Sequence, residues 1–183
     1  MRISKEKAAE NRDRILKAAS RLMRERGISG VGVDELTEAA GMTHGSLYSQ
    51  FGSKERLVEE AIADAIATKG QELHAGATLH DYVSEYLSPE HRDEPGGGCP
   101  FSALCCEMRH QSKAARDRFT AGVKGMVGWI SGQLNAGAKQ RRREDEALAT
   151  LSSLVGAVVL ARAVNDPKLS DDILRAARSE LGL

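Results

Sequence analysis

The sequence predicts an all-α protein of about nine helices, in which an N-terminal helix-turn-helix precedes a larger helical domain. Apolar residues recur at helical spacing along almost the whole chain. No alternating run of apolar and polar residues between hairpin turns predicts a strand. The length of 183 residues suits one domain, or a small module joined to a larger one.

Start and stop signals place the individual helices. Gly27 and Gly41 are typical of helix ends, whereas Thr43 and Ser53 are typical N-caps. Ser170, followed by two aspartates, predicts the start of the last helix, and the stretch 89–98 is expected to be a loop. The nine helices are therefore expected at about 15–26, 36–40, 43–51, 53–66, 79–87, 100–108, 119–134, 148–159 and 171–181.

Charge is balanced overall but uneven along the chain. The 26 Lys and Arg residues equal the 26 Asp and Glu residues, which excludes a polycation that holds nucleic acid by bulk charge. The segment Arg2–Arg26 nevertheless has nine basic residues against four acidic ones, a net charge of +5. Aromatic residues make up only 4% of the chain, so a protein that stacks single-stranded bases on aromatic side chains is not expected.

Membrane insertion and secretion are not expected either. The most apolar run, Leu154–Ala161, is shorter than the ~20 residues that a membrane span needs. The N-terminal segment is too polar for a signal peptide. Three cysteines do not form an even disulfide framework, so a reducing cytoplasm is the expected compartment.

The stretch 33–57 has the pattern of a helix-turn-helix, whose second helix enters the DNA major groove. Small residues at 39–41 allow two short helices to cross, and Leu36, Leu47 and Phe51 can anchor them from behind. Tyr48 and Lys54 are placed to contact phosphates. The short polar residues expected to reach base edges are Thr43, His44, Gly45, Ser46, Ser49 and Gln50. The alternative is a helical hairpin that only packs.

This segment resembles the DNA-binding domain of the TetR (tetracycline repressor) family of bacterial transcriptional regulators. The resemblance covers about residues 11–67 and depends on the motif Ala39-Ala40-Gly41-Met42-Thr43-x-Gly45-Ser46-Leu47-Tyr48-x-x-Phe51-Gly52-Ser53-Lys54-Glu55. It implies a DNA-binding domain in residues 1–52, continuing into the next helix to about residue 67, and an effector-binding and dimerisation domain in residues 68–183. It also implies a ligand-released dimeric repressor that binds a palindromic operator, with no cofactor and no metal.

Two departures from the family pattern affect the expected DNA contacts. The second helix opens on Val31, Gly32, Val33 and Asp34 instead of Thr or Ser, so Asp34 is expected to stabilise the helix end by its charge. The frequent Lys after the cap of the reading helix is His44 here. The basic arm, residues 2–14, is expected to compensate by reaching along the DNA backbone or into the minor groove.

The chain's two last helices are expected to form the dimer interface. The helix around Leu154 is apolar on nearly every side and therefore needs neighbours on every side. A buried core within one chain is the alternative. We favour an interface made by residues 147–164 and 171–181, which suits two-fold symmetric DNA reading.

Three interpretations of the cysteines remain open. Cys99 is expected at a helix N-cap, which would lower its thiol pKa, and Cys106 lies one turn before Arg109 and His110. In the first interpretation the cysteines are small buried or incidental residues. In the second, Cys99 or Cys106 senses electrophiles or oxidants. In the third, Cys99, Cys106 and His110 bind a metal ion. A cysteine-dependent enzyme using Cys106 and His110 lacks a positioned third group.

A small apolar or aromatic molecule is the expected effector. For each residue expected to line the effector pocket, the alternative is ordinary packing in the core. Gly122, Gly125 and Gly128 thin one side of their helix and permit either close helix contact or a cavity. The candidate lining residues are Ile62, Ile66, Phe101, Leu104, Met108, Phe119, Met126, Trp129 and Ile130. A helical adaptor that binds only protein is a further alternative to the regulator.

Overall fold

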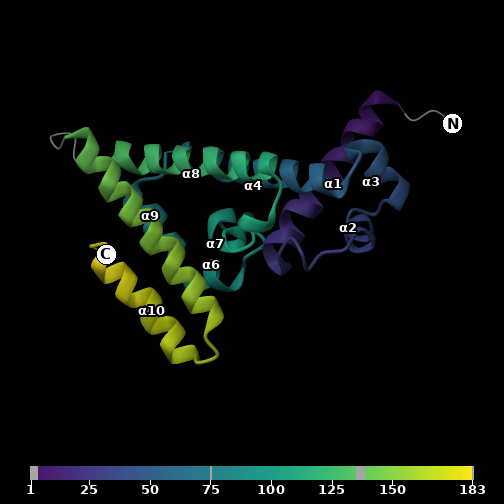
Figure 1. Cartoon of the computed structure of the whole chain (residues 1–183). Helices are drawn as coiled ribbons and strands as arrows, with labels where there is room; N and C mark the ends of the chain where they lie inside the picture. Colours follow the sequence, from purple (N-terminus) through teal and green to yellow (C-terminus); the bar gives the residue numbers. More distant parts are fainter. Residues whose placement is uncertain (1–3, 75, 135–138, 183) are drawn as a thin grey trace.

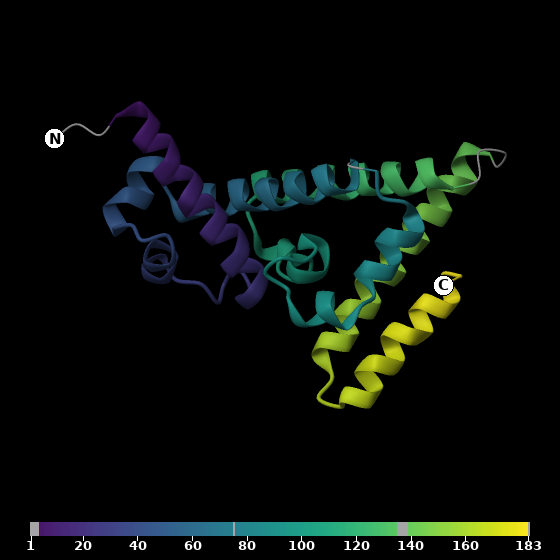
Figure 2. The same ribbon diagram turned by 180° about the vertical axis from the view of Figure 1, so that it is seen from behind.

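The computed structural model describes residues 4–74, 76–134 and 139–182, and within them the chain is all-helical (Figures 1 and 2). The predicted fold class is confirmed, with ten α-helices and one 3-10 turn in the described residues. In chain order they are α1 (Lys5–Arg26), α2 (Val33–Ala39), α3 (His44–Phe51), α4 (Lys54–His74), α5 (Leu79–Tyr86), α6 (Pro89–Asp93), α7 (Pro100–Leu104), η1 (Met108–His110), α8 (Lys113–Gln133), α9 (Gln140–Ala163) and α10 (Pro167–Glu180).

Several expected bounds were wrong: α7 ends at Leu104 instead of 108, α8 begins at Lys113 instead of 119, and α9 begins at Gln140 instead of 148. Two further expectations were also wrong. The expected loop 89–98 begins with helix α6, because the Ser88 hydroxyl accepts a hydrogen bond from the His91 amide and Pro89 occupies the first helical position. Helix α10 begins four residues before its expected start, since Asp166 is the cap that accepts from the Leu169 amide. Ser170 is instead buried inside the helix.

The basic arm is not extended where the structure describes it. Ser4 caps α1, and the chain is helical from Lys5 onward, so only residues before Ser4 lie outside the described part of this arm. Arg12 is already engaged, because its guanidinium pairs with Glu60 and lies 4.5 Å from the centre of the Phe51 ring. The expected contact of this arm with DNA therefore involves one face of a helix.

Two apolar clusters form the core. The first packs α1, α2, α3 and the start of α4 around Leu36, Leu47 and Phe51. The second packs the end of α4 with α5, α7, α8, α9 and α10. Ile66 of α4 and Phe119 of α8 touch both clusters, so these two long helices connect the small N-terminal helices to the rest of the chain (Figure 1).

Helix α9 is, among the described helices, the one that is long and apolar enough to cross a membrane by length and composition alone. It packs against both α8 and α10. Of the most apolar 18-residue stretch of this helix, 39% is buried within the chain. Its outward face carries Leu148 and Leu160, which are 49% and 57% exposed, and Leu169 of α10 is 47% exposed. These large apolar side chains of α9 and α10 are therefore exposed to solvent in the single chain instead of being buried in its core.

Candidate functional site

Helices α2 and α3 form a compact helix-turn-helix. The turn between them is closed by the Gly41 amide, which donates to the Glu38 carbonyl at 2.8 Å, and by the Met42 amide, which donates to the Thr37 carbonyl at 2.7 Å. Gly41 has a φ of 62°, a conformation that side chains other than glycine rarely adopt. A Cβ at this position would also approach Arg14 Nη2 to 2.8 Å, so glycine fits the turn on both counts.

Helix α3 buries two anchors and exposes short polar side chains. Leu47 and Phe51 are almost fully buried and hold the helix against α1 and α2. Thr43 is the N-cap residue, but its hydroxyl lies 3.0 Å from the Ser46 hydroxyl instead of capping a backbone amide. The residues predicted to face DNA are all exposed or half-buried: Thr43, His44, Gly45, Ser46, Tyr48, Ser49 and Gln50.

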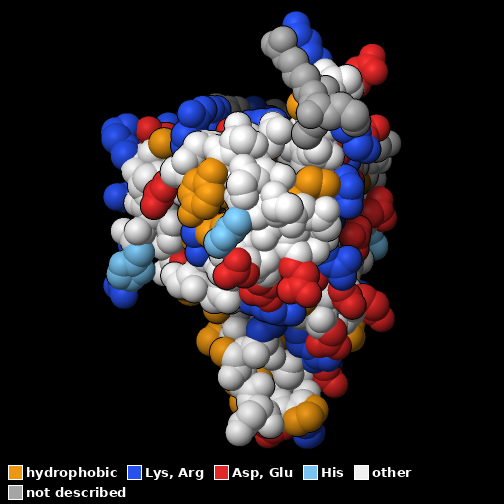
Figure 3. All heavy atoms as spheres, turned by 90° about the vertical axis from the view of Figure 1, so that its right-hand side faces the viewer, with side chains coloured by type: hydrophobic (Ala, Val, Ile, Leu, Met, Phe, Trp, Pro, Cys, Tyr) orange, Lys and Arg blue, Asp and Glu red, His pale blue; other side chains and the backbone are white. Residues whose placement is uncertain are grey.

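The face of the molecule seen in Figure 3 is largely uncharged, with acidic side chains gathered on one side of it. His44 and Tyr48 lie one turn apart with ring centres 6.0 Å from each other. His44 Nε2 is also 3.4 Å from the Asp34 carboxylate, which is highly exposed. The opening of α2 therefore presents the Asp34 carboxylate beside α3, a contact that the sequence did not predict.

Lys54 lies at the start of α4 and is half-buried. Its ammonium donates to the Val31 carbonyl at 2.5 Å and so connects α4 to the chain just before α2. This bond gives Lys54 a structural role that the sequence did not predict, and any phosphate contact must share the same ammonium.

A cavity of about 450 Å³ lies between α4, α5, α7 and α8, within the range of ~300–1,000 Å³ typical of small-molecule sites. Ile66, Phe101, Met126 and Trp129 line it, as predicted for the pocket. The other predicted lining residues lie elsewhere. Ile62, Leu104 and Met108 are buried in the first cluster, Phe119 packs against both clusters, and Ile130 is buried in the second.

Sequence reasoning missed the tyrosines of this cavity. Tyr82 and Tyr86 of α5 line it, with their ring centres 5.4 Å apart, and Tyr82 meets Trp129 edge-on at 5.4 Å. Neither hydroxyl has a hydrogen-bond partner among the described residues. Burial, with the Cys99 thiol as a second cause, raises the pKa of both phenols well above its usual value. Their spacing of four residues was the signal available in the sequence.

Cys99 occupies the predicted N-cap of α7, but the expected effect on its thiol is wrong. The thiol makes no cap hydrogen bond, and burial raises its pKa instead of lowering it. Burial, followed by the neighbouring Cys106, raises the pKa of Cys105 to about 11. Cys106 is exposed, and its Sγ lies 3.9 Å from that of Cys105.

The suggested metal ligands do not come together. Cys99 is buried, Cys106 is exposed, and His110 accepts a hydrogen bond from its neighbour Arg109 at 2.8 Å. Among the described residues, no three metal-ligating side chains form a group.

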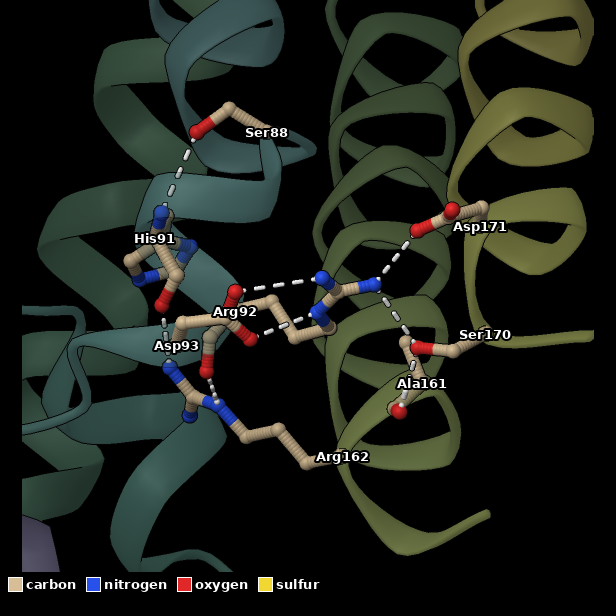
Figure 4. A network of polar contacts seen from close by, with 8 residues as sticks. All are labelled: Ser88, His91, Arg92, Asp93, Ala161, Arg162, Ser170 and Asp171. Atoms are coloured by element: carbon tan, nitrogen blue, oxygen red, sulfur yellow. Dashed lines mark hydrogen bonds and ion pairs between the residues drawn. The ribbon is translucent and has the colours of Figure 1, made fainter. Parts of the chain in front are cut away.

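Helix α6 connects the cavity to the last two helices (Figure 4). His91 borders the cavity, where its Nε2 accepts from the Cys99 amide. Arg162 of α9 donates to the carbonyls of His91 and Arg92, at 2.6 and 2.9 Å. Arg92 in turn donates to Ser170 and Asp171 of α10. These bonds hold α6 between the cavity and the α9–α10 pair.

The segment 95–107, which includes the cavity wall at Cys99–Phe101, is bonded to the N-terminal helices near both of its ends. Arg24 of α1 donates to the Gly96 carbonyl through Nε at 2.7 Å. The Glu107 carboxylate accepts from the amides of Ile28 and Ser29, both at 2.9 Å, just after α1. The sequence did not predict these two contacts, because they join residues more than 70 positions apart.

Comparison with known proteins agrees with this architecture. Residues 15–61 match the family model described as "Bacterial regulatory proteins, tetR family". Over 56 residues the chain is 39% identical to the HTH-type transcriptional repressor KstR2 of Mycolicibacterium smegmatis, a match that spans 31% of this chain and 27% of that protein. An uncharacterised HTH-type transcriptional regulator of Mycobacterium tuberculosis is 27% identical over 185 residues, with 93% of each chain covered.

Solved structures extend the likeness to the whole fold. The crystal structure of the reduced form of Escherichia coli NemR is similar with a TM-score of 0.76 and 21% identity, covering 94% of this chain and 95% of that one. At this identity the likeness shows the fold alone. The helix-turn-helix and the family match over residues 15–61 agree with the expectation of a DNA-binding regulator instead of an enzyme. Residues 15–61 are thus of the TetR family of bacterial regulatory proteins, and the described chain has the fold of solved structures from that family.

Proposed function

We propose that this chain is a sequence-specific repressor that binds operator DNA as a homodimer and is released by a small molecule. The observation that carries the proposal is the surface of α3, where short polar side chains stand over two buried anchors. Such side chains can approach base edges in the major groove without a steric conflict. Thr43, His44, Gly45, Ser46, Ser49 and Gln50 would read bases, with Tyr48 and Lys54 on phosphates. Binding of chromosomal DNA would place the protein in the cytoplasm.

A second copy of the chain would cover the exposed apolar face of α9 and α10. Leu148, Leu160 and Leu169 are large apolar side chains that are about half exposed in the single chain. Four helices, two from each copy, would bury them around a two-fold axis. The two α3 helices would then read half-sites about one helical turn (~34 Å) apart. We accordingly place the division between the DNA-binding and dimerisation domains at about residue 67.

Release from DNA would follow from the two contacts that join the cavity wall to the N-terminal helices. An occupant that moves Cys99–Phe101 would also shift Gly96 and Glu107, which bond to Arg24 and to the Ile28 and Ser29 amides. The effector acts only if it binds the displaced arrangement more tightly than the DNA-bound one. The cavity and the reading helix are coupled in this way without direct contact.

Selection of bound sequences from random duplex DNA tests the proposed function. The expected result is a palindrome with half-sites about one turn apart, since a symmetric dimer reads the same bases twice. A matched selection with Thr43→Asp and Ser46→Asp, which add negative charge to the exposed face, should recover no palindrome. Recovery of no preferred sequence by the unaltered chain would refute the proposal, and so would an unchanged palindrome from the double variant.

A second candidate is a repressor of the same fold that senses electrophiles or oxidants through a cysteine. The favouring observation is the exposed thiol of Cys106, next to Cys105 and one residue before Glu107, which contacts the N-terminal helices. Modification of Cys106 would disturb that contact. Alkylation of the reduced protein, followed by mass mapping, tests it: fast reaction at Cys106 with loss of operator binding is expected. Slow and equal reaction at all three cysteines would end this candidate.

A further inference from the structure

The cavity is unusually aromatic for this chain. Phe, Trp and Tyr total seven residues in the whole sequence, and four of them line the cavity: Tyr82, Tyr86, Phe101 and Trp129. Ordinary core packing would distribute so few aromatic side chains over both clusters. Three of these rings, Tyr82, Tyr86 and Trp129, are neighbours, and Phe101 lines the cavity from α7, which suits stacking against the face or edge of another ring.

Small residues recur along the parts of α4 and α8 that line the cavity. Helix α8 lines the cavity with Arg118, Ala121, Gly122, Gly125, Met126 and Trp129, which recur every three or four positions and so share one face of the helix. Helix α4 does the same with Ala63, Ile66, Ala67, Gly70 and Leu73. Glycine and alanine alternate with larger side chains on these faces, so parts of the backbone of both helices border the cavity.

The glycines on these faces have different roles. At Gly122 a Cβ would approach the Ile66 side chain to 2.7 Å, so this glycine permits close packing of α8 on α4. At Gly70 and Gly125 a Cβ would meet nothing within 4 Å, although both residues border the cavity. Packing does not require glycine at these two positions, and because both line the cavity we expect a longer side chain there to reduce its volume.

The charges around the cavity are exposed or already paired. Lys69 pairs with Glu72 at 2.7 Å, and Arg118 pairs with Glu59 at 3.4 Å. Asp81 and Glu85 are exposed, and both ring nitrogens of His91 are engaged by backbone groups. A charged occupant would lose its hydration without gaining a free counter-ion inside, which is unfavourable.

We propose that the cavity is a slot for a planar, uncharged aromatic molecule, and that the missing side chains of Gly70 and Gly125 set its width. The molecule would lie along the adjoining faces of α4 and α8, beside Gly70 and Gly125, and stack on the aromatic side chains that line the cavity. The identification of this occupant as the effector depends on the proposed function, whereas its binding does not.

A fluorescence titration tests the width of the slot. The probe is N-phenyl-1-naphthylamine, an uncharged aromatic amine whose emission rises in apolar surroundings and which accepts excitation energy from tryptophan. Trp129 is the single tryptophan of the chain and lines the cavity, so energy transfer reports that the probe binds near it, and the glycine variants below test whether it binds in the cavity. Gly70→Val and Gly125→Val should each raise the Kd at least about tenfold, because the added side chain overfills the slot.

Gly128→Val is the matched control. Gly128 lies on the same helix as Gly125, is exposed, does not border the cavity and would meet nothing within 4 Å. All three substitutions replace a helical glycine by the same residue, so their effects on helix propensity are alike. The Kd of Gly128→Val should stay within about twofold of the parent value. Equal effects of Gly125→Val and Gly128→Val, or no probe binding by the parent chain, would overturn the proposal.

Competition against the probe tests planarity. 2-Naphthol and decahydro-2-naphthol share one carbon skeleton and one hydroxyl, but the first is flat and the second is puckered. The flat compound should displace the probe at a concentration at least about tenfold lower. Equal displacement, or preference for the puckered compound, would overturn the slot. Operator affinity is measured in parallel without the probe. If the parent chain binds no operator, the proposed function is contradicted. The order of the probe Kd values among the variants still tests the slot independently.

Discussion

The N-terminal helices and the larger helical body use their interiors in opposite ways. In the N-terminal helices, Leu36, Leu47 and Phe51 are almost fully buried, and the functional side chains stand outside on α3. In the body, aromatic side chains surround a cavity of about 450 Å³, and the functional surface lies inside. A surface that reads DNA requires a rigid support, whereas a site that admits a ligand requires space that packing leaves unfilled.

The largest expected difference between the two regions is the cost of removing a phenylalanine. Phe51→Ala should lower the free energy of unfolding by about 3–5 kcal/mol, because the ring is enclosed and lies beneath Arg12. Phe101→Ala should cost about 2–3 kcal/mol, since its ring already borders a cavity and has fewer contacts to lose. Urea unfolding of both variants measures the difference. Equal losses, or a larger loss for Phe101→Ala, would show that the two interiors are packed alike.

Removal of the bond between the two regions should have the next largest effect. Glu107→Ala leaves the Ile28 and Ser29 amides without their acceptor and should cost about 1–3 kcal/mol of stability. It should also weaken the effect of a bound ligand on operator affinity, because Arg24 then makes the remaining hydrogen bonds from this segment to α1, beside the apolar packing of α7. Glu107→Gln, which keeps one acceptor oxygen, is the control and should give intermediate values. An unchanged ligand response in Glu107→Ala would contradict the proposed coupling.

The same substitution in the two regions should separate DNA binding from packing. Tyr48→Phe removes an exposed hydroxyl from α3 and should weaken operator binding by about 0.5–1.5 kcal/mol, roughly two- to tenfold. Tyr86→Phe removes a buried hydroxyl that has no partner among the described residues, so operator affinity should stay unchanged and stability should not fall. Fluorescence anisotropy with labelled operator, and thermal unfolding, measure these outcomes. A loss of stability in Tyr86→Phe would mean that the Tyr86 hydroxyl forms a hydrogen bond in solution, and would contradict this prediction.

Acid should destabilise the body before the N-terminal helices. Burial lowers the pKa of His91 below its usual value of ~6.5, whereas the imidazole of His44 is exposed. The unfolded chain therefore takes up a proton on His91 more readily than the folded chain. The stability that neutral His91 contributes is complete above pH ~6.5 and is lost as the pH falls through the folded pKa. Hydrogen exchange between pH 7.5 and 5 should show earlier opening around α6, and His91→Gln should remove this dependence.

The features that could be predicted from the sequence are those that depend on residues close together in the chain. Spacing, glycine stops and caps located α1–α5, and the small and polar residues of 39–50 identified the helix-turn-helix together with its exposed face. Four of the nine predicted pocket residues line the cavity. Periodicity identifies the apolar face of a helix, but it does not separate residues that border a cavity, such as Met126, from those buried beside it, such as Ile130.

The remaining features depend on contacts between distant parts of the chain. Helix α6 has a local cap at Ser88, yet it is held in place by Arg162, some 70 residues later. The pKa of Cys99 follows burial by neighbouring elements and not its position at a helix N-terminus. Spacing along the sequence carries no information about either relation.

The most direct test of the account is the composition of the complex on a selected palindrome. The account predicts two chains per duplex by native mass measurement, one for each α3. Insertion of five base pairs at the centre turns the half-sites by about half of the ~10.5 base-pair helical repeat and should weaken binding at least about tenfold. One chain per duplex, or undiminished binding to the lengthened site, would contradict a symmetric pair of reading helices.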